Sequence, residues 1–167
     1  NAEFSPWQPH QYRRVDRMVP APEQAERAAA MLAAAELPMI HAGSGVIHAD
    51  AYDELRRVAE LLHAPVTTSW AGRGVLPETS ELAIPMPFIP LNNEVRNDAD
   101  LVLVVGSRLG ETDWWGKAPY WRHPSEQQMI QVDIDGHVLG ANKPAALNVQ
   151  ADAKLFLAAL AERLQPS

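Results

Sequence analysis

The sequence predicts an α/β fold, an open parallel sheet of five to six strands with helices on both faces. Short apolar runs alternate along the chain with longer segments whose apolar residues recur at helical spacing. Residues 101–105 are five consecutive apolar residues, which is typical of a strand covered on both faces, as in a parallel sheet. The connections are long enough for the crossovers that parallel strands need. Together these features favour a Rossmann-like arrangement.

The composition is that of a globular protein with one domain. The chain has 167 residues, of which 47% are hydrophobic and 21% charged. A net charge of −7 argues against nucleic-acid binding, which needs clustered basic residues. No apolar run approaches the length of a membrane span. Because the sequence has no cysteine, disulfides, thiolate nucleophiles and cysteine-ligated zinc are excluded, and a reducing compartment such as the cytoplasm is expected.

The first 21 residues are expected to lie outside the domain. Asn1 and Ala2 look like the remnant of an expression tag. Residues 3–21 contain three prolines and no periodic pattern, which favours an interdomain linker. The domain itself is predicted to span residues 22–165.

Proline and aspartate mark the helix boundaries. Pro22 suits the first turn of a helix that must end before Pro38. Asp50 is expected to cap a second helix, and a third is predicted over 91–99. Asp152 is expected to cap the last one.

Strands are predicted where apolar or β-branched runs are short. Val66 follows Pro65 and opens one of them. The five predicted strands are 39–42, 66–68, 101–105, 129–135 and 146–149. A short helical turn is expected over 136–141.

The segments that follow these strands are expected to meet at one edge of the sheet, where ligands bind in such folds. They are residues 43–45, 69–74, 106–111, 133–136 and 150–152. Gly43-Ser44-Gly45 is part of a dinucleotide-binding pattern, but His48 stands where its third glycine belongs. Because glycine lets backbone N–H groups approach a phosphate, these residues and Gly106 favour either nucleotide contact or a tight turn.

Two carboxylates end the fourth predicted strand. Asp133 and Asp135 alternate with Ile134 and therefore point to the same side. One of them can accept hydrogen bonds from a ribose. The alternative is that Asp135 caps the next segment and Asp133 pairs locally.

Arg108 and Asp152 also have two interpretations each. The guanidinium of Arg108 suits a diphosphate, or an ion pair with Glu111 or Asp113. Asp152 suits a helix cap, or an adenine or ribose contact.

No residue pattern predicts catalysis or a metal ligand in this chain. The nucleophile-elbow and histidine-pair motifs are missing. His41 is expected to be a core residue with its hydrogen bonds satisfied. Trp114, Trp115 and Trp121 are expected to serve packing or a subunit interface rather than nucleic-acid stacking.

Five motifs occur in the order found in a known family. They are Leu-Pro-Met-Ile with Gly-Ser-Gly in 37–45, Leu-Leu-His-Ala-Pro-Val in 61–66, Gly-Arg-Gly-Val-Leu-Pro-Glu in 72–78, Ala-Asp-Leu to Gly-Ser-Arg in 98–109, and Ile-Gln-Val-Asp-Ile-Asp in 130–135. The chain thereby resembles the central domain of thiamine-diphosphate-dependent enzymes, the group of acetolactate synthases and of benzoylformate and oxalyl-CoA decarboxylases. The resemblance covers about residues 20–165.

The resemblance implies a larger parent enzyme that acts on 2-oxo acids as a lyase or transferase. In this family thiamine diphosphate and magnesium bind between the first and third domains of two subunits. The magnesium-binding Gly-Asp-Gly motif is missing from this chain. The resemblance therefore implies that this chain is inactive alone, bridges flanking catalytic domains, and belongs to a homo-dimer or homo-tetramer.

Some members bind FAD or ADP in this domain, and the resemblance places Gly43, Arg108, Asp133 and Asp152 at nucleotide contacts. The full candidate set is Gly43, Ser44, Gly45, Gly106, Arg108, Asp133, Asp135 and Asp152. FAD-binding relatives carry a glycine-rich segment after the one that ends at Glu78, where this chain has prolines in 85–90. ADP, or no nucleotide, therefore remains open alongside FAD.

Two alternatives belong to other classes. One is a free-standing NAD- or FAD-binding oxidoreductase or sirtuin-like module. The other is a purely structural domain.

Overall fold

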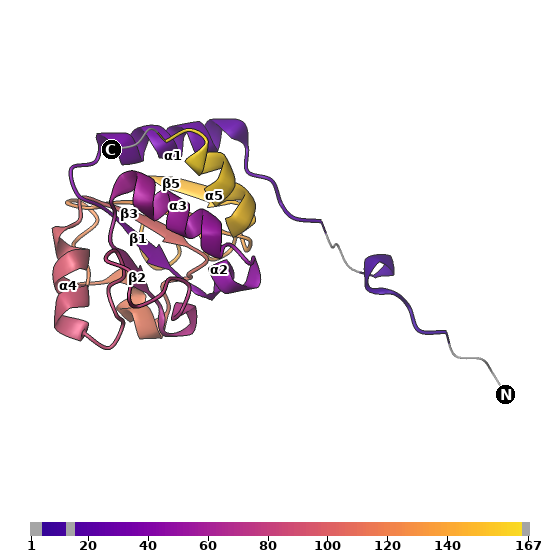
Figure 1. Ribbon diagram of the computed structural model, residues 1–167, viewed down its shortest axis with the longest axis horizontal. Helices are drawn as coiled ribbons and strands as arrows, with labels where there is room; N and C mark the ends of the chain where they lie inside the picture. The colour runs from indigo at the N-terminus through magenta and orange to yellow at the C-terminus, as the bar shows by residue number, and fades with distance from the viewer. Residues whose placement is uncertain (1–4, 13–15, 165–167) are drawn as a thin grey trace.

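The fold was analysed in a computed structural model that describes residues 5–12 and 16–164. In this part of the chain, five parallel strands form one sheet in the order β2-β1-β3-β4-β5 (Figure 1). They are β1 (Pro38–Ala42), β2 (Val66–Thr68), β3 (Leu101–Val105), β4 (Gln128–Asp133) and β5 (Leu147–Gln150). The predicted open parallel sheet is confirmed.

The helices lie between the strands in the chain. The α-helices are α1 (Pro22–Ala34), α2 (Ser44–His48), α3 (Tyr52–Leu62), α4 (Ile89–Asp98) and α5 (Ala153–Ala161). Three short 3-10 helices are η1 (Pro9–Gln11), η2 (Trp70–Gly72) and η3 (Glu111–Gly116).

Alternation along the strands builds a separate core on each face of the sheet. In β1, Ile40 and Ala42 pack with α1, α3 and α5 in the larger core, whereas Met39 joins the smaller core beside α4. Trp121, from the loop after β3, fills the centre of that smaller core. The prediction of helices on both faces is confirmed, and Figure 1 shows α4 apart from α1, α3 and α5.

The strand order places a switch point between β1 and β3. The chain runs from β1 to β2 on one side and then returns to β3 on the other. Ala42 is level with Thr68 of β2 and with Val105 of β3, so the carboxyl ends of the three strands are aligned. A crevice forms between the loops that leave in opposite directions at such a point.

Two local predictions were wrong. Asp50 does not cap α3: it has a left-handed φ of 53°, Ala51 is the N-cap, and the Asp50 carboxylate lies 3.3 Å from Lys154 Nζ. Residues 136–141 form turns rather than helix, and β4 ends at Asp133. In both places a polar side chain organises a turn instead of starting a helix.

The predicted linker is described only in parts. The tag remnant lies outside the described residues. Residues 5–12 are exposed throughout. The Met18 carbonyl accepts a hydrogen bond from the Asp152 N–H over 2.9 Å, so the chain already contacts the domain before α1 begins.

Candidate functional site

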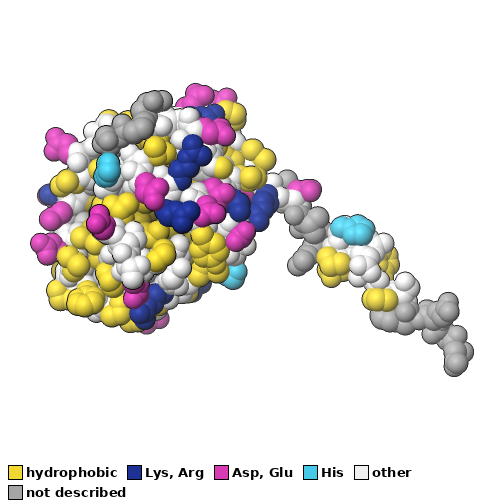
Figure 2. All heavy atoms as spheres, viewed as in Figure 1, with side chains coloured by type: hydrophobic (Ala, Val, Ile, Leu, Met, Phe, Trp, Pro, Cys, Tyr) yellow, Lys and Arg dark blue, Asp and Glu magenta, His cyan; other side chains and the backbone are white. Residues whose placement is uncertain are grey.

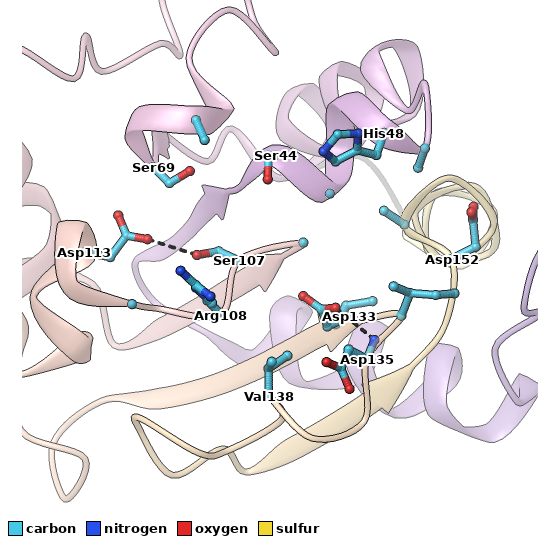
Figure 3. A pocket seen from close by; sticks show the side chains of 18 of the residues that line it. Ser44, His48, Ser69, Ser107, Arg108, Asp113, Asp133, Asp135, Val138 and Asp152 are labelled. Atoms are coloured by element: carbon cyan, nitrogen blue, oxygen red, sulfur yellow. Dashed lines mark hydrogen bonds between the residues drawn. The ribbon is translucent and has the colours of Figure 1, made fainter.

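A cleft lies at the carboxyl edge of the sheet (Figure 3). Its volume is about 750 Å³, within the usual range of ligand sites. All five strand-end segments contribute to it, through residues that include Ser44, Gly45, Ser69, Gly106, Arg108, Asp133, Asp135 and Asp152. Parallel strands therefore bring these distant segments together, as the topology requires.

Gly43, Gly45 and Gly106 allow two backbone segments to pack closely. The turn after β1 lies against the end of β3, and a Cβ atom at Gly43 would overlap the Gly106 carbonyl. The Gly43 N–H donates to the Val105 carbonyl over 2.9 Å, and the Gly45 N–H donates to the Gly106 carbonyl over 3.0 Å. Gly45 and Gly106 line the cleft, but Gly43 is not among its lining residues. The tight-turn interpretation accounts for this geometry directly.

Asp133 and Asp135 each stabilise the turn after β4. Oδ1 of Asp133 accepts a hydrogen bond from the Asp135 N–H over 3.0 Å. Oδ1 of Asp135 accepts one from the His137 N–H over 2.9 Å. Burial raises the pKa of Asp133 above its usual value. Both residues line the cleft, and Figure 3 shows them beside β4.

Asp152 is the N-cap of α5, which confirms that prediction. Its Oδ1 accepts hydrogen bonds from the N–H groups of Lys154 and Leu155 at 3.0 and 3.2 Å. Arg17 NH1 also donates to this oxygen over 3.0 Å, and to the Ala49 carbonyl over 2.7 Å. Because Ala49 and Asp152 both line the cleft, Arg17 bridges two segments of its rim. The sequence gave no sign of this contact.

Arg108 lines the cleft with an exposed side chain. Asp113, one predicted partner, turns inward to Ser107 and His41. None of the ion pairs among the described residues includes Arg108 or Glu111. The guanidinium is thus placed where a ligand can reach it.

A buried polar cluster lies behind one wall of the cleft. His41 Nδ1 lies 3.0 Å from Thr67 Oγ1, and His41 Nε2 lies 3.5 Å from Asp113 Oδ2. Ser107 Oγ donates to the same Asp113 oxygen over 3.0 Å. Burial lowers the pKa of His41. Burial also raises the pKa of Asp113, but His41, Ser107 and Arg96 outweigh it, and the pKa ends below its usual value.

Arg96, from α4, lies within the same cluster. Its guanidinium carbon is 4.8 Å from the ring centre of Trp121 and 5.5 Å from that of Trp114. Burial lowers its pKa to about 10. Its nitrogens have no hydrogen-bond partner among the described residues, so the aromatic faces are its principal contacts. Trp121 therefore serves packing, as predicted, while Trp115 is 44% exposed.

Two further classes of site were searched for in residues 5–12 and 16–164. No group of three acidic or histidine side chains there is placed to hold a metal ion. No helix in these ranges is long and apolar enough to cross a membrane.

Comparison with known proteins identifies the family. The family model described as "Thiamine pyrophosphate enzyme, central domain" matches residues 25–160. The chain belongs to this family. This central domain is 37% identical, over 95% of its length, to the probable 2-ketoarginine decarboxylase AruI of Pseudomonas aeruginosa. It is 32% identical, over 89% of its length, to the acetolactate synthase large subunit of Corynebacterium glutamicum.

The central domain spans only about a quarter of these relatives, 27% and 24% respectively. Its fold is similar to that of benzoylformate decarboxylase from Polynucleobacter necessarius. The TM-score is 0.75 at 22% identity, over 99% of this chain and 31% of that one. The predicted family and fold are confirmed, and the free-standing oxidoreductase alternative is set aside.

Proposed function

We propose that this chain is the non-catalytic central domain of a thiamine-diphosphate-dependent lyase or transferase acting on a 2-oxo acid. The identity to AruI supports this most directly, because it covers 95% of the chain but only 27% of that relative. The residues of this chain do not fit a thiamine diphosphate and magnesium site, since it has no Gly-Asp-Gly motif and the described part has no cluster of metal ligands. The catalytic groups therefore belong to flanking domains.

The role of the domain is to bridge those flanking domains within a homo-dimer or homo-tetramer, in a cytoplasmic enzyme. Exposed apolar side chains support this role. Phe88 and Leu91, at the start of α4, are 62% and 40% exposed. Figure 2 shows hydrophobic side chains at the surface in the region of α4. Large apolar side chains left at a surface favour contact with another protein surface.

We also propose that the cleft accepts an adenine nucleotide, with ADP and FAD as the candidates. Its position at the switch point supports this, as do carboxylates suited to ribose hydroxyls and an unpaired Arg108 suited to a phosphate. The proposed contacts are Ser44, Gly45, Gly106, Arg108, Asp133, Asp135 and Asp152, with Gly43 behind them. Residues 85–90 are not among the cleft lining, so this segment offers no contact to a flavin ring there.

The test of the parent activity compares this chain with the complete reading frame that contains it. The full protein, supplied with thiamine diphosphate and Mg²⁺, should release CO₂ from a panel of 2-oxo acids or join them to an acceptor. The 167-residue chain should do neither. Turnover by this chain alone, or a complete frame without catalytic domains, would contradict the proposal.

The test of the cleft measures thermal unfolding of this chain with ADP, FAD and NAD. A ligand that binds only the folded state raises the unfolding temperature in proportion to its saturation. Arg108→Ala should reduce the shift, whereas Arg27→Ala, on α1, should leave it unchanged. No shift with any of the three would leave the bridging role alone standing.

A further inference from the structure

The charges around the cleft are predominantly negative. Glu111, Asp133 and Asp135 line it together with a single arginine, Arg108. Asp152 lines it as well, but its charge is already compensated by Arg17. A phosphate group placed here would meet more carboxylates than cations, so each added negative charge is opposed.

Backbone donors of the kind that hold diphosphates in such folds are already occupied here. The Gly43 and Gly45 N–H groups donate to carbonyls of Val105 and Gly106, and the Gly106 N–H donates to Val132 over 2.8 Å. At α5, the first free N–H groups donate to the Asp152 carboxylate. Helix α2, which follows the Gly43 turn, has only five residues. Few donors are therefore left for phosphate oxygens.

Acceptors for hydroxyl groups are available instead. Asp133 and Asp135 each use Oδ1 in a turn, and Oδ2 of each accepts no hydrogen bond from the described residues. Asp113 lines the cleft, is 2% exposed, and its Oδ1 has no donor among the described residues. Unsatisfied acceptors favour a ligand that brings hydrogen-bond donors.

From these three observations we propose that the cleft selects an uncharged nucleoside, with adenosine as the fitting class, over nucleoside diphosphates and dinucleotides. This inference rests on the proposed adenine site and concerns only the phosphates. The ribose hydroxyls donate to the carboxylates beside β4, and affinity falls with each phosphate added. Arg108 compensates part of one phosphate charge and leaves the others opposed.

Isothermal titration calorimetry of this chain tests the order of affinity. Adenosine, AMP, ADP and FAD are titrated at low and at high NaCl concentration, with and without Mg²⁺. We expect adenosine to bind most tightly, with a loss of about tenfold at each added phosphate, a difference of ~1.4 kcal/mol. High salt should reduce the difference between adenosine and ADP, because it screens the repulsion.

A charge-neutralising variant with a matched control tests the cause. Glu111→Gln should narrow the adenosine–ADP difference severalfold. Glu36→Gln, an exposed glutamate on the segment before β1, should leave the difference unchanged. The salt dependence of the unmodified chain supplies the same information if the Glu111 variant folds poorly.

Two results would overturn the inference, and they are distinguishable. ADP, its magnesium complex or FAD binding more tightly than adenosine would refute the nucleoside preference while supporting the proposed nucleotide site. No binding of any of the four compounds would refute the adenine site and the preference with it.

Discussion

Single residues around the cleft divide into those that fix the backbone and those that face its interior. Gly43 belongs to the first group, because the end of β3 occupies the space where its side chain would be. Arg108 and Asp133 belong to the second. The types of residue at both kinds of position were predictable from the sequence. Which glycine does which task was not, because that depends on two loops that meet only in the folded chain.

Gly43→Ala should destabilise the domain by about 2–3 kcal/mol, the effect of forcing an extra group into a packed interior. The added methyl would overlap the Gly106 carbonyl, and a backbone cannot move aside as a flexible side chain does. Urea unfolding followed by circular dichroism measures the change. Gly110→Ala is the control, since its Cβ would meet only the Arg108 side chain, 3.2 Å away, and should cost under about 1 kcal/mol. Equal stability of the two variants would contradict this account.

At the scale of elements, strands were more predictable than the turns between them. β3 is apolar at every position and buried at every position. Asp50 resembles a helix cap in sequence, but its left-handed backbone and its contact with Lys154 place it in a turn. Asp152 has the extended backbone that a cap needs, and it does cap α5. Local sequence did not distinguish the two aspartates, because the difference is set by tertiary contacts.

Arg17→Ala should loosen the segment before α1 without unfolding the domain. The Arg17–Asp152 ion pair is partly exposed, so its loss should cost under about 1 kcal/mol of unfolding free energy. The hydrogen bond from the Asp152 N–H to the Met18 carbonyl should open more often as a result. Amide hydrogen exchange at Asp152 measures this, with an expected acceleration of about fivefold.

Arg27→Ala is the matched control for this prediction. Arg27 also donates to a backbone carbonyl, that of Ala146, but lies on α1. Unchanged exchange at Asp152 in the Arg17 variant, or equal acceleration in both variants, would show that Arg17 does not hold this segment.

For the molecule as a whole, the sheet order and the position of the cleft were within reach of the sequence. The buried cluster was not. His41, Arg96 and Asp113 lie on β1, α4 and η3, and nothing in their local patterns indicates that they converge. His41 was correctly expected in the core, but its neighbours follow only from how the loop after β3 folds back over the sheet.

The stability of the domain should fall as the pH decreases below about 6.5, the usual pKa of histidine. His41 has a lowered pKa in the folded state, so the unfolded chain takes up a proton that the folded chain resists. Unfolding free energy therefore rises with pH in this range, by at most ~1.4 kcal/mol per pH unit for one group. Asp113, whose pKa is also lowered, loses its contribution only at more acidic pH.

Urea unfolding at a series of pH values from 5 to 8 measures this dependence. His41→Gln should flatten it, since glutamine does not titrate. His10→Gln, in the exposed segment before the domain, should retain it. A flat profile in the unmodified chain, or an unchanged one in the His41 variant, would refute the assignment.

The close crossing of the Gly43 turn and the end of β3 has a consequence for how ligand preference can evolve in this domain. Folding itself sets this part of the crevice, so an arriving molecule meets a surface that is already ordered and forfeits little entropy in shaping it. Substitutions at the crossing sacrifice the fold, whereas exposed positions such as 108 and 111 can change charge at small cost. Divergent members can thus acquire, exchange or lose a bound molecule while the scaffold between their catalytic halves stays intact.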